Sequence, residues 1–173
     1  MRTAVLVIVL STSLLAVEPP DGSETWSLTR GKYFDVHTDG TRREPAGFVR
    51  HLDRFWTGLA AEFGVKLRET PLTPVYVFRC RADFEDYMVG QGKPKELSGW
   101  CRLGRDRRFI VTYDRDYGPH DSVWTVLRHE ATHLFVFDHV PNARGLPGWL
   151  SEGLACYYET AGVTEEGLVV GKV

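Results

Sequence analysis

The sequence predicts an α+β fold in which a small mixed sheet of about four strands packs on helices. Two observations lead to this prediction. Segments with the two-residue alternation of strands and segments with the three- and four-residue apolar spacing of helices follow one another in the order β-α-β-α-β-β-α-α. No repeat, low-complexity tract or long linker separates them, so we expect a single domain.

The first 17 residues have the pattern of a secretory signal peptide. Arg2 is followed by an apolar run that begins at Ala4, and Ala16 is the small residue expected near a cleavage site. The run is shorter than the roughly 20 residues that cross a bilayer, so we expect no stable membrane span in the mature chain. We therefore predict that residues 18–173 form the domain, which is secreted or resides in the periplasm or cell envelope.

The first half of the domain should contain two strands and two helices. Residues 33–38 and 74–80 have strand character, and residues 82–89 should form a short helix. In residues 44–63 the apolar side chains recur at helical spacing and predict an amphipathic helix ended by Gly64. His51 lies on this helix, and we expect it to be a surface or hydrogen-bonded residue rather than a ligand.

The second half should contain a hairpin and two helices. Residues 98–103 and 108–113 are joined by a turn and predict the hairpin. Residues 121–138 should form a helix with Asp121 or Ser122 as its N-cap, and residues 149–160 the last helix.

The charge balance and the cysteine count limit the classes of partner. The 21 basic and 23 acidic residues leave a formal net charge of −2, which gives no reason to expect nucleic acid or an anionic membrane as a partner. Of the three cysteines, Cys80 and Cys101 lie near predicted strands and could pair in an oxidising compartment. None of the three stands at zinc-ligand spacing.

The run His129-Glu130-Ala131-Thr132-His133 is an H-E-x-x-H motif inside a predicted helix. Residues four apart lie on the same helical face, so both imidazoles can bind one metal ion. Two neutral imidazoles suit zinc, and Glu130 is placed to deprotonate a water molecule at the ion. The alternative is two histidines on a helix flank beside a solvated glutamate.

Glu152 follows His133 by 19 positions and extends the motif to H-E-x-x-H-x18-E. A carboxylate from a second helix is the usual third ligand when two histidines come from the first. Proline and glycine are frequent between positions 141 and 148, which predicts a helix–loop–helix that brings Glu152 to the histidines. We predict one Zn²⁺ ion bound by His129, His133 and Glu152. An ordinary acid near a helix N-terminus is the alternative for Glu152.

These segments, with Trp149-Leu150-Ser151-Glu152-Gly153 around the third ligand, resemble the gluzincin branch of zinc metallopeptidases, which includes thermolysin and the aminopeptidase N family. The nearest likeness is to the bacterial peptidase-MA-like family, a domain of unknown function. Weaker similarity extends upstream, so the resemblance covers most of the mature chain, and only the two zinc-site segments are specific. It implies a zincin-like fold, His129, His133 and Glu152 as zinc ligands, and Glu130 as the general base.

His139 is a rival ligand, because it stands where the metzincin pattern H-E-x-x-H-x-x-G-x-x-H has its third histidine. That pattern needs a glycine where this chain has Val136. On an unbroken helix His139 lies roughly 15 Å along the axis from His129, which is too far to share an ion. We expect His139 to be a histidine near the helix C-terminus.

The resemblance also implies where a substrate binds. The sheet edge beside the zinc-site helix pairs with an extended peptide in gluzincins, which makes residues 109–113 the candidate edge. A strand inside the sheet is the alternative.

Two departures from the family pattern concern the chemistry of the site. Gluzincins place a tyrosine or histidine oxyanion donor well beyond the glutamate ligand, whereas only 21 residues follow Glu152, in a short C-terminal helical part. Relatives also often carry an acid four residues after that ligand, and here the residue is Cys156, so Glu159 or a backbone carbonyl must orient the first histidine. The candidate donors are Tyr113, His120, Tyr157 and Tyr158.

We therefore expect a secreted zinc-dependent peptidase that hydrolyses a peptide or protein substrate through a metal-activated water. The alternative is a binding domain that keeps the zincin scaffold with weak or no turnover. Glu130 favours the peptidase, because a binding domain has no need of a general base. The missing oxyanion donor favours the binding domain.

Overall fold

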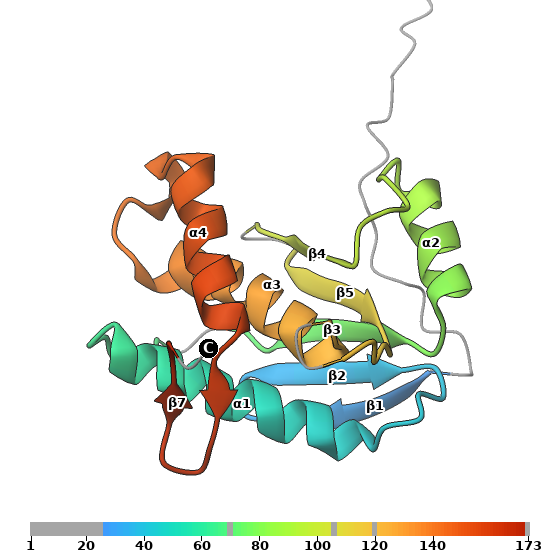
Figure 1. Ribbon diagram of the computed structural model, residues 1–173, viewed down its shortest axis with the longest axis horizontal. Helices are drawn as coiled ribbons and strands as arrows, with labels where there is room; N and C mark the ends of the chain where they lie inside the picture. The colour runs from blue at the N-terminus through green and yellow to red at the C-terminus, as the bar shows by residue number, and fades with distance from the viewer. Residues whose placement is uncertain (1–25, 69–70, 105–106, 119–120, 172–173) are drawn as a thin grey trace, which may run out of the picture.

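The computed structural model describes residues 26–68, 71–104, 107–118 and 121–171, and the predicted signal peptide lies outside these ranges. The described chain has a five-stranded mixed sheet with helices, which confirms the predicted α+β class (Figure 1). None of the helices in these ranges has the length and hydropathy of a membrane span. The elements are β1 (Ser27–Arg30), β2 (Phe34–Thr38), α1 (Pro45–Glu62), β3 (Thr73–Phe78), α2 (Arg81–Gly90), β4 (Gly99–Arg102), β5 (Phe109–Tyr113), α3 (Val123–His139), the 3₁₀ turn η1 (Ala143–Gly145), α4 (Gly148–Glu159), β6 (Gly162–Val163) and β7 (Leu168–Val169).

The strands of the main sheet lie in the order β1-β2-β3-β5-β4. β2, β3 and β5 are parallel, while β1 and β4 run antiparallel to their neighbours at the two edges. β1 was not expected from the sequence, because three of its four residues are exposed and carry no apolar alternation. β6 and β7 form a separate two-stranded sheet, which contacts α1.

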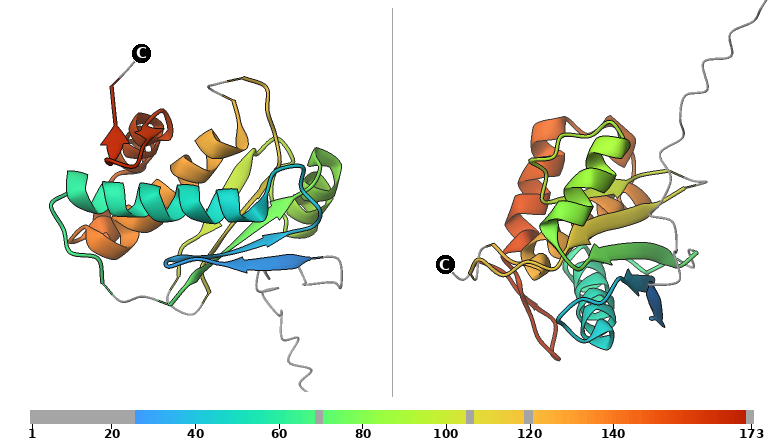
Figure 2. Two further views of the ribbon diagram at one scale, coloured as in Figure 1. Left: turned by 90° about the horizontal axis from the view of Figure 1, so that it is seen from below. Right: turned by 90° about the vertical axis from the view of Figure 1, so that its right-hand side faces the viewer.

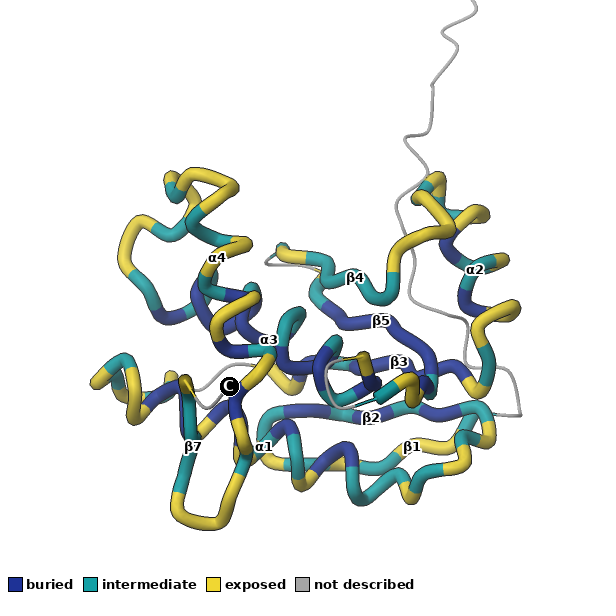
Figure 3. The backbone as a smooth tube through the Cα atoms, in the orientation of Figure 1, coloured by how far each residue is buried: buried dark blue, intermediate teal, exposed yellow. Residues whose placement is uncertain are grey.

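Helices cover both faces of the sheet, and side chains along each strand alternate between the two cores. On β3, Val75 and Val77 belong to the core beneath α1 and α3, whereas Tyr76 and Phe78 belong to the core beneath α2. The views in Figure 2 show α1 and α2 on different sides of the strands. The central strands are buried, whereas α4 is exposed along much of its length (Figure 3).

The prediction that residues 109–113 form a free sheet edge is wrong. These residues are β5, whose five residues are all buried between β3 and β4. The hairpin docks through its second strand, which pairs in parallel with β3 and leaves the first strand, β4, at the edge.

The order of the strands also explains why Cys80 and Cys101, which the sequence left as a possible pair, form no disulfide bond. Cys80 follows β3 and Cys101 lies on β4, with β5 between these strands. Two strand spacings amount to about 10 Å, which exceeds the reach of a disulfide bond. Both thiols are free, as is that of Cys156.

Arg128 on α3 connects three helices. Its Nε donates to the carbonyl oxygen of Glu159 at the end of α4, at 2.6 Å, and its Nη1 lies 3.4 Å from Nε2 of His51 on α1. Because a guanidinium can only donate, Nε2 of His51 accepts this bond. The His51 ring also packs on Trp124, with ring centroids 4.6 Å apart. His51 is therefore a hydrogen-bonded residue of the helix interface, as the sequence predicted.

Burial, together with the charge of Arg128, lowers the pKa of His51 from 6.5 to about 3. Because the unfolded chain binds a proton near pH 6.5 and the folded chain does not, stability should fall as the pH decreases from 6.5 towards 3. The contribution of one such group is at most about 1.4 kcal/mol per pH unit. We expect the free energy of unfolding of His51→Gln, from urea titrations between pH 7 and pH 4.5, to depend less steeply on pH than that of the wild type. Equal slopes for the two proteins would contradict the buried, neutral state of His51.

Candidate metal centre

Helix α3 brings His129 and His133 together. The helix begins after Ser122, whose hydroxyl accepts from the backbone N–H of Thr125 at 3.4 Å, and continues unbroken to His139. Ser122 is thus one of the two predicted N-caps. The two rings lie 4.9 Å apart between centroids, and their Nε2 atoms face each other at 3.2 Å.

Glu152 on α4 supplies the third group. Its Oε2 lies 3.4 Å from Nε2 of His129, and its Oε1 lies 3.5 Å from Nε2 of His133. α4 starts directly after Pro147, which cannot continue a preceding helix, and the fully buried Ala155 lets α4 lie close to α3. The two helices share the most extensive helix–helix contact in the described chain.

The distances among these three groups fit one tetrahedral metal ion. Ligand atoms at about 2.0–2.1 Å from zinc and at tetrahedral angles are about 3.3 Å apart. The two Nε2 atoms are 3.2 Å apart, and each lies 3.4 or 3.5 Å from one of the two carboxylate oxygens of Glu152. Two imidazoles and one carboxylate also form a donor set that zinc prefers in catalytic sites. The residues present therefore fit the predicted ion.

The far side of each imidazole is held by a hydrogen bond from α4. Nδ1 of His129 lies 2.6 Å from Oε2 of Glu159, and Nδ1 of His133 lies 3.0 Å from Oγ of Ser151. An ionised carboxylate can only accept, so Nδ1 of His129 carries the proton and Nε2 presents its lone pair to the centre. Glu159 was one of the two predicted partners of His129, whereas the contact of Ser151 was not foreseen.

Glu130 points to the other side of α3, towards β4. Burial raises the pKa of its carboxyl group, while His129 and a hydrogen bond with the Cys101 thiol oppose this shift. Burial and the nearby carboxylate of Glu130 raise the pKa of Cys101 well above its ordinary value. β4 comes this close to α3 at Gly99, where a Cβ atom would lie 2.4 Å from the Val126 side chain. The position of Glu130 suits a general base beside the centre, rather than a further ligand.

A pocket of about 300 Å³ lies beside Glu130 and His129. Its wall comes from β4 and the residues before it, from Arg115 and Asp121 between β5 and α3, from the first half of α3, and from α4. The lining residues are Leu97, Ser98, Gly99, Arg115, Asp121, Thr125, Val126, His129, Glu130 and Glu159. This pocket could receive part of a substrate next to the general base.

None of the candidate oxyanion donors in the described chain lines this pocket. Tyr113 is buried in the core under α2, and Tyr158 packs against Phe63. Tyr157 is 50% exposed, and His120 lies outside the described residues.

His139 and Cys156 differ in their distance from the candidate centre. His139 is 4% exposed and packs between the rings of Phe135 and Trp56, so it is not part of the centre. Cys156, by contrast, offers its Sγ within 4.8 Å of ligand atoms of His129 and Glu159. Cys156 stands four residues after Glu152, so the helix brings both side chains to the same face.

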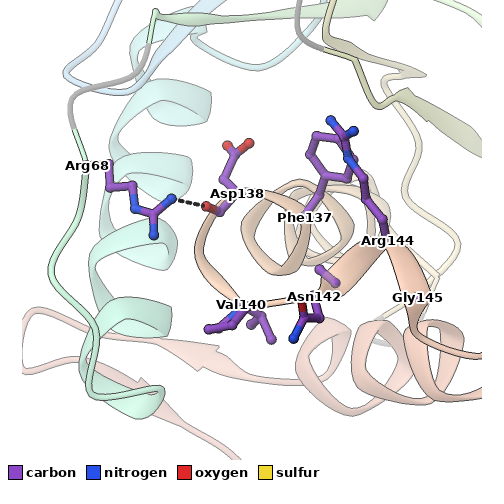
Figure 4. A pocket seen from close by; sticks show the side chains of 9 residues that line it. Arg68, Phe137, Asp138, Val140, Asn142, Arg144 and Gly145 are labelled. Atoms are coloured by element: carbon purple, nitrogen blue, oxygen red, sulfur yellow. Dashed lines mark hydrogen bonds between the residues drawn. The ribbon is translucent and has the colours of Figure 1, made fainter.

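A second depression, of about 680 Å³, lies at the C-terminal end of α3 (Figure 4). There Arg68 donates to the carbonyl oxygen of Asp138 at 3.4 Å, and Arg144 lies over the ring of Phe137 at 5.0 Å. It contains none of the predicted zinc ligands.

The contact of Glu159 with His129 gives a prediction about metal affinity. Glu159→Gln should weaken zinc binding about 10- to 100-fold, because the amide no longer holds the Nδ1 proton and the ring orientation as firmly. Competition with a chromophoric chelator would measure the affinity. Glu165→Gln is the matched control, since that exposed carboxylate pairs with Arg54 at the surface. The same zinc affinity in Glu159→Gln and in the control would refute the orienting role.

Comparison with models of protein families and with curated proteins returned no match to this chain. The assignment of a metal to His129, His133 and Glu152 therefore depends on their chemistry and geometry.

Proposed function

We propose that this protein is a zinc-dependent peptidase that hydrolyses peptide bonds with Glu130 as general base. The observation that carries the proposal is that two imidazole nitrogens 3.2 Å apart each face an oxygen of the Glu152 carboxylate at 3.4 or 3.5 Å, with Glu130 and a pocket beside them. His129, His133 and Glu152 would hold one zinc ion. When bound at such a centre, zinc lowers the pKa of a coordinated water towards neutrality and polarises a carbonyl group.

Glu130 would move the proton. A general base works best when its pKa lies near the operating pH, and burial shifts the pKa of Glu130 in that direction. Its carboxylate would take a proton from the attacking water and pass it to the leaving amine. The Cys101 thiol would hold the carboxylate in place between β4 and α3.

The free edge of β4 would bind the peptide backbone. β4 is the last strand of the sheet and carries Gly99 next to Glu130. An extended peptide that adds to this edge gains main-chain hydrogen bonds with little demand on its side chains. The edge and the 300 Å³ pocket would thus place a peptide bond near Glu130.

A metal-holding binding domain is the second candidate function. It is favoured by the lack of a tyrosine among the described residues that line the pocket. Tetrahedral intermediates of peptide hydrolysis need a hydrogen-bond donor for the oxyanion in addition to the ion.

The variant Glu130→Gln separates the two functions. We expect the purified wild type and this variant to bind one equivalent of zinc each, and only the wild type to cleave unfolded casein. The loss of rate should be about 10²- to 10⁴-fold, the usual contribution of a general base. Glu166→Gln, at an exposed position of the β6–β7 hairpin, should retain the wild-type rate.

Metal content would come from atomic absorption and cleavage from peptide mass spectrometry. One equivalent of zinc without any hydrolysis that depends on Glu130 would select the binding domain, and absence of zinc would reject both candidates.

A further inference from the structure

Arg115 is a buried cation that the proposed chemistry does not use. It follows β5 by two residues, is 9% exposed, and forms an ion pair with Asp121 through Nη2. Its guanidinium lies over the rings of Tyr113 and Tyr117, at 5.3 and 5.4 Å from their centroids. These contacts fix the side chain in place.

Most of its hydrogen-bonding capacity is unused. An arginine side chain has five N–H groups, and among the described residues only its Nη2 finds a hydrogen-bond acceptor. The Nε and Nη1 atoms are buried, and no acceptor for them lies in the part of the chain that the structure describes. Buried donors without an acceptor are rare and costly, so a group held in this way is expected to meet an acceptor in a ligand complex.

Arg115 forms a common wall between two depressions. One is the 300 Å³ pocket that also contains His129 and Glu130. The other, of about 430 Å³, lies towards the start of α2 and the loop before α1. A ligand that contacts Arg115 from this second depression therefore lies next to the metal centre.

The two depressions differ in charge. The pocket at the centre contains the carboxyl groups of Asp121, Glu130 and Glu159, which disfavour an anion there. The second depression is lined by five arginines and two aspartates. Both aspartates pair with Arg43, the carboxylate of Asp39 lies near Arg79, and the side chain of Arg42 has no ion-pair partner among the described residues. The arginine-lined depression therefore has a positive surplus.

We propose that Arg115 and the arginine-lined depression bind carboxylate groups of acidic peptides beside the metal centre. The planar guanidinium fork of Arg115 matches a carboxylate, and the surrounding arginines attract it from solution. The carboxylate belongs to an aspartate or glutamate side chain, or to the C-terminus of the peptide. That the ligand is a peptide rests on the proposed function; that it is an anion rests on Arg115 and its neighbours.

Binding can be measured without turnover in the variant Glu130→Gln loaded with zinc. The probes are four fluorescent ten-residue peptides with either three glutamates or three glutamines, each with a free or an amidated C-terminus. We expect the glutamate peptides or the free C-termini to bind at least tenfold more tightly than their neutral counterparts. The preference should weaken in 0.5 M NaCl, since the arginines other than Arg115 are partly exposed. The four probes distinguish side-chain carboxylates from the terminal one.

Further substitutions assign the preference to Arg115. Arg115→Gln should abolish it, and Arg50→Gln, an exposed arginine on α1, should keep it. Asp121→Asn should strengthen it, because the competing carboxylate is removed, and a gain of this kind cannot come from misfolding. Equal affinity for acidic and neutral peptides, or no binding of any probe, would overturn the inference. So would a preference that survives Arg115→Gln, because the carboxylate would then bind the zinc ion.

Hydrolysis of the same four peptides by the wild type tests the proposed function separately. A preference for carboxylates without cleavage would reject the peptidase and keep the anion site. Cleavage without a carboxylate preference would keep the peptidase and reject the anion site.

Discussion

The hydrogen bond from Arg128 to the carbonyl oxygen of Glu159 fixes the end of α4 against α3, and the candidate centre depends on this contact. His129 and His133 each contact one group from α4 on their outer side, Glu159 and Ser151 respectively, while Glu152 faces both on the inner side. A rotation of α4 by one residue, about 100°, would misplace all three groups at once. The close packing at Ala155 and the buried guanidinium therefore determine whether the three ligand atoms converge.

The opposite side of α3 is constrained by β4. Gly99 allows the strand to approach the helix, and the Cys101 thiol then meets the carboxylate of Glu130. Removal from solvent raises the pKa of this carboxyl group. The hydrogen bond with the Cys101 thiol stabilises the ionised carboxylate and so opposes this rise. One helix thus presents potential ligands to α4 and a potential base to the sheet edge. The two ligands and the base point in different directions although all three lie within residues 129–133 of one helix.

Much of this arrangement could be predicted because it depends on local spacing. Two histidines four apart on a helix must share a face, and the breakers before Glu152 required a turn back to that face. The docking of the β4–β5 hairpin could not be predicted, because either strand can pair with β3 and both have apolar residues. For the same reason the sequence did not reveal that Cys101 meets Glu130. The two residues are brought together by tertiary packing, not by periodicity.

The three potential ligands differ in their access to water. The side chains of His129 and His133 are 21% and 11% exposed, whereas that of Glu152 is 63% exposed. An ion that arrives from solution would meet two imidazoles held by hydrogen bonds to α4 and a carboxylate that is largely exposed to solvent. Capture would then proceed in stages, with the carboxylate closing last and opening first. Such a centre would exchange its ion readily, and its occupancy would follow the supply of metal in the surroundings.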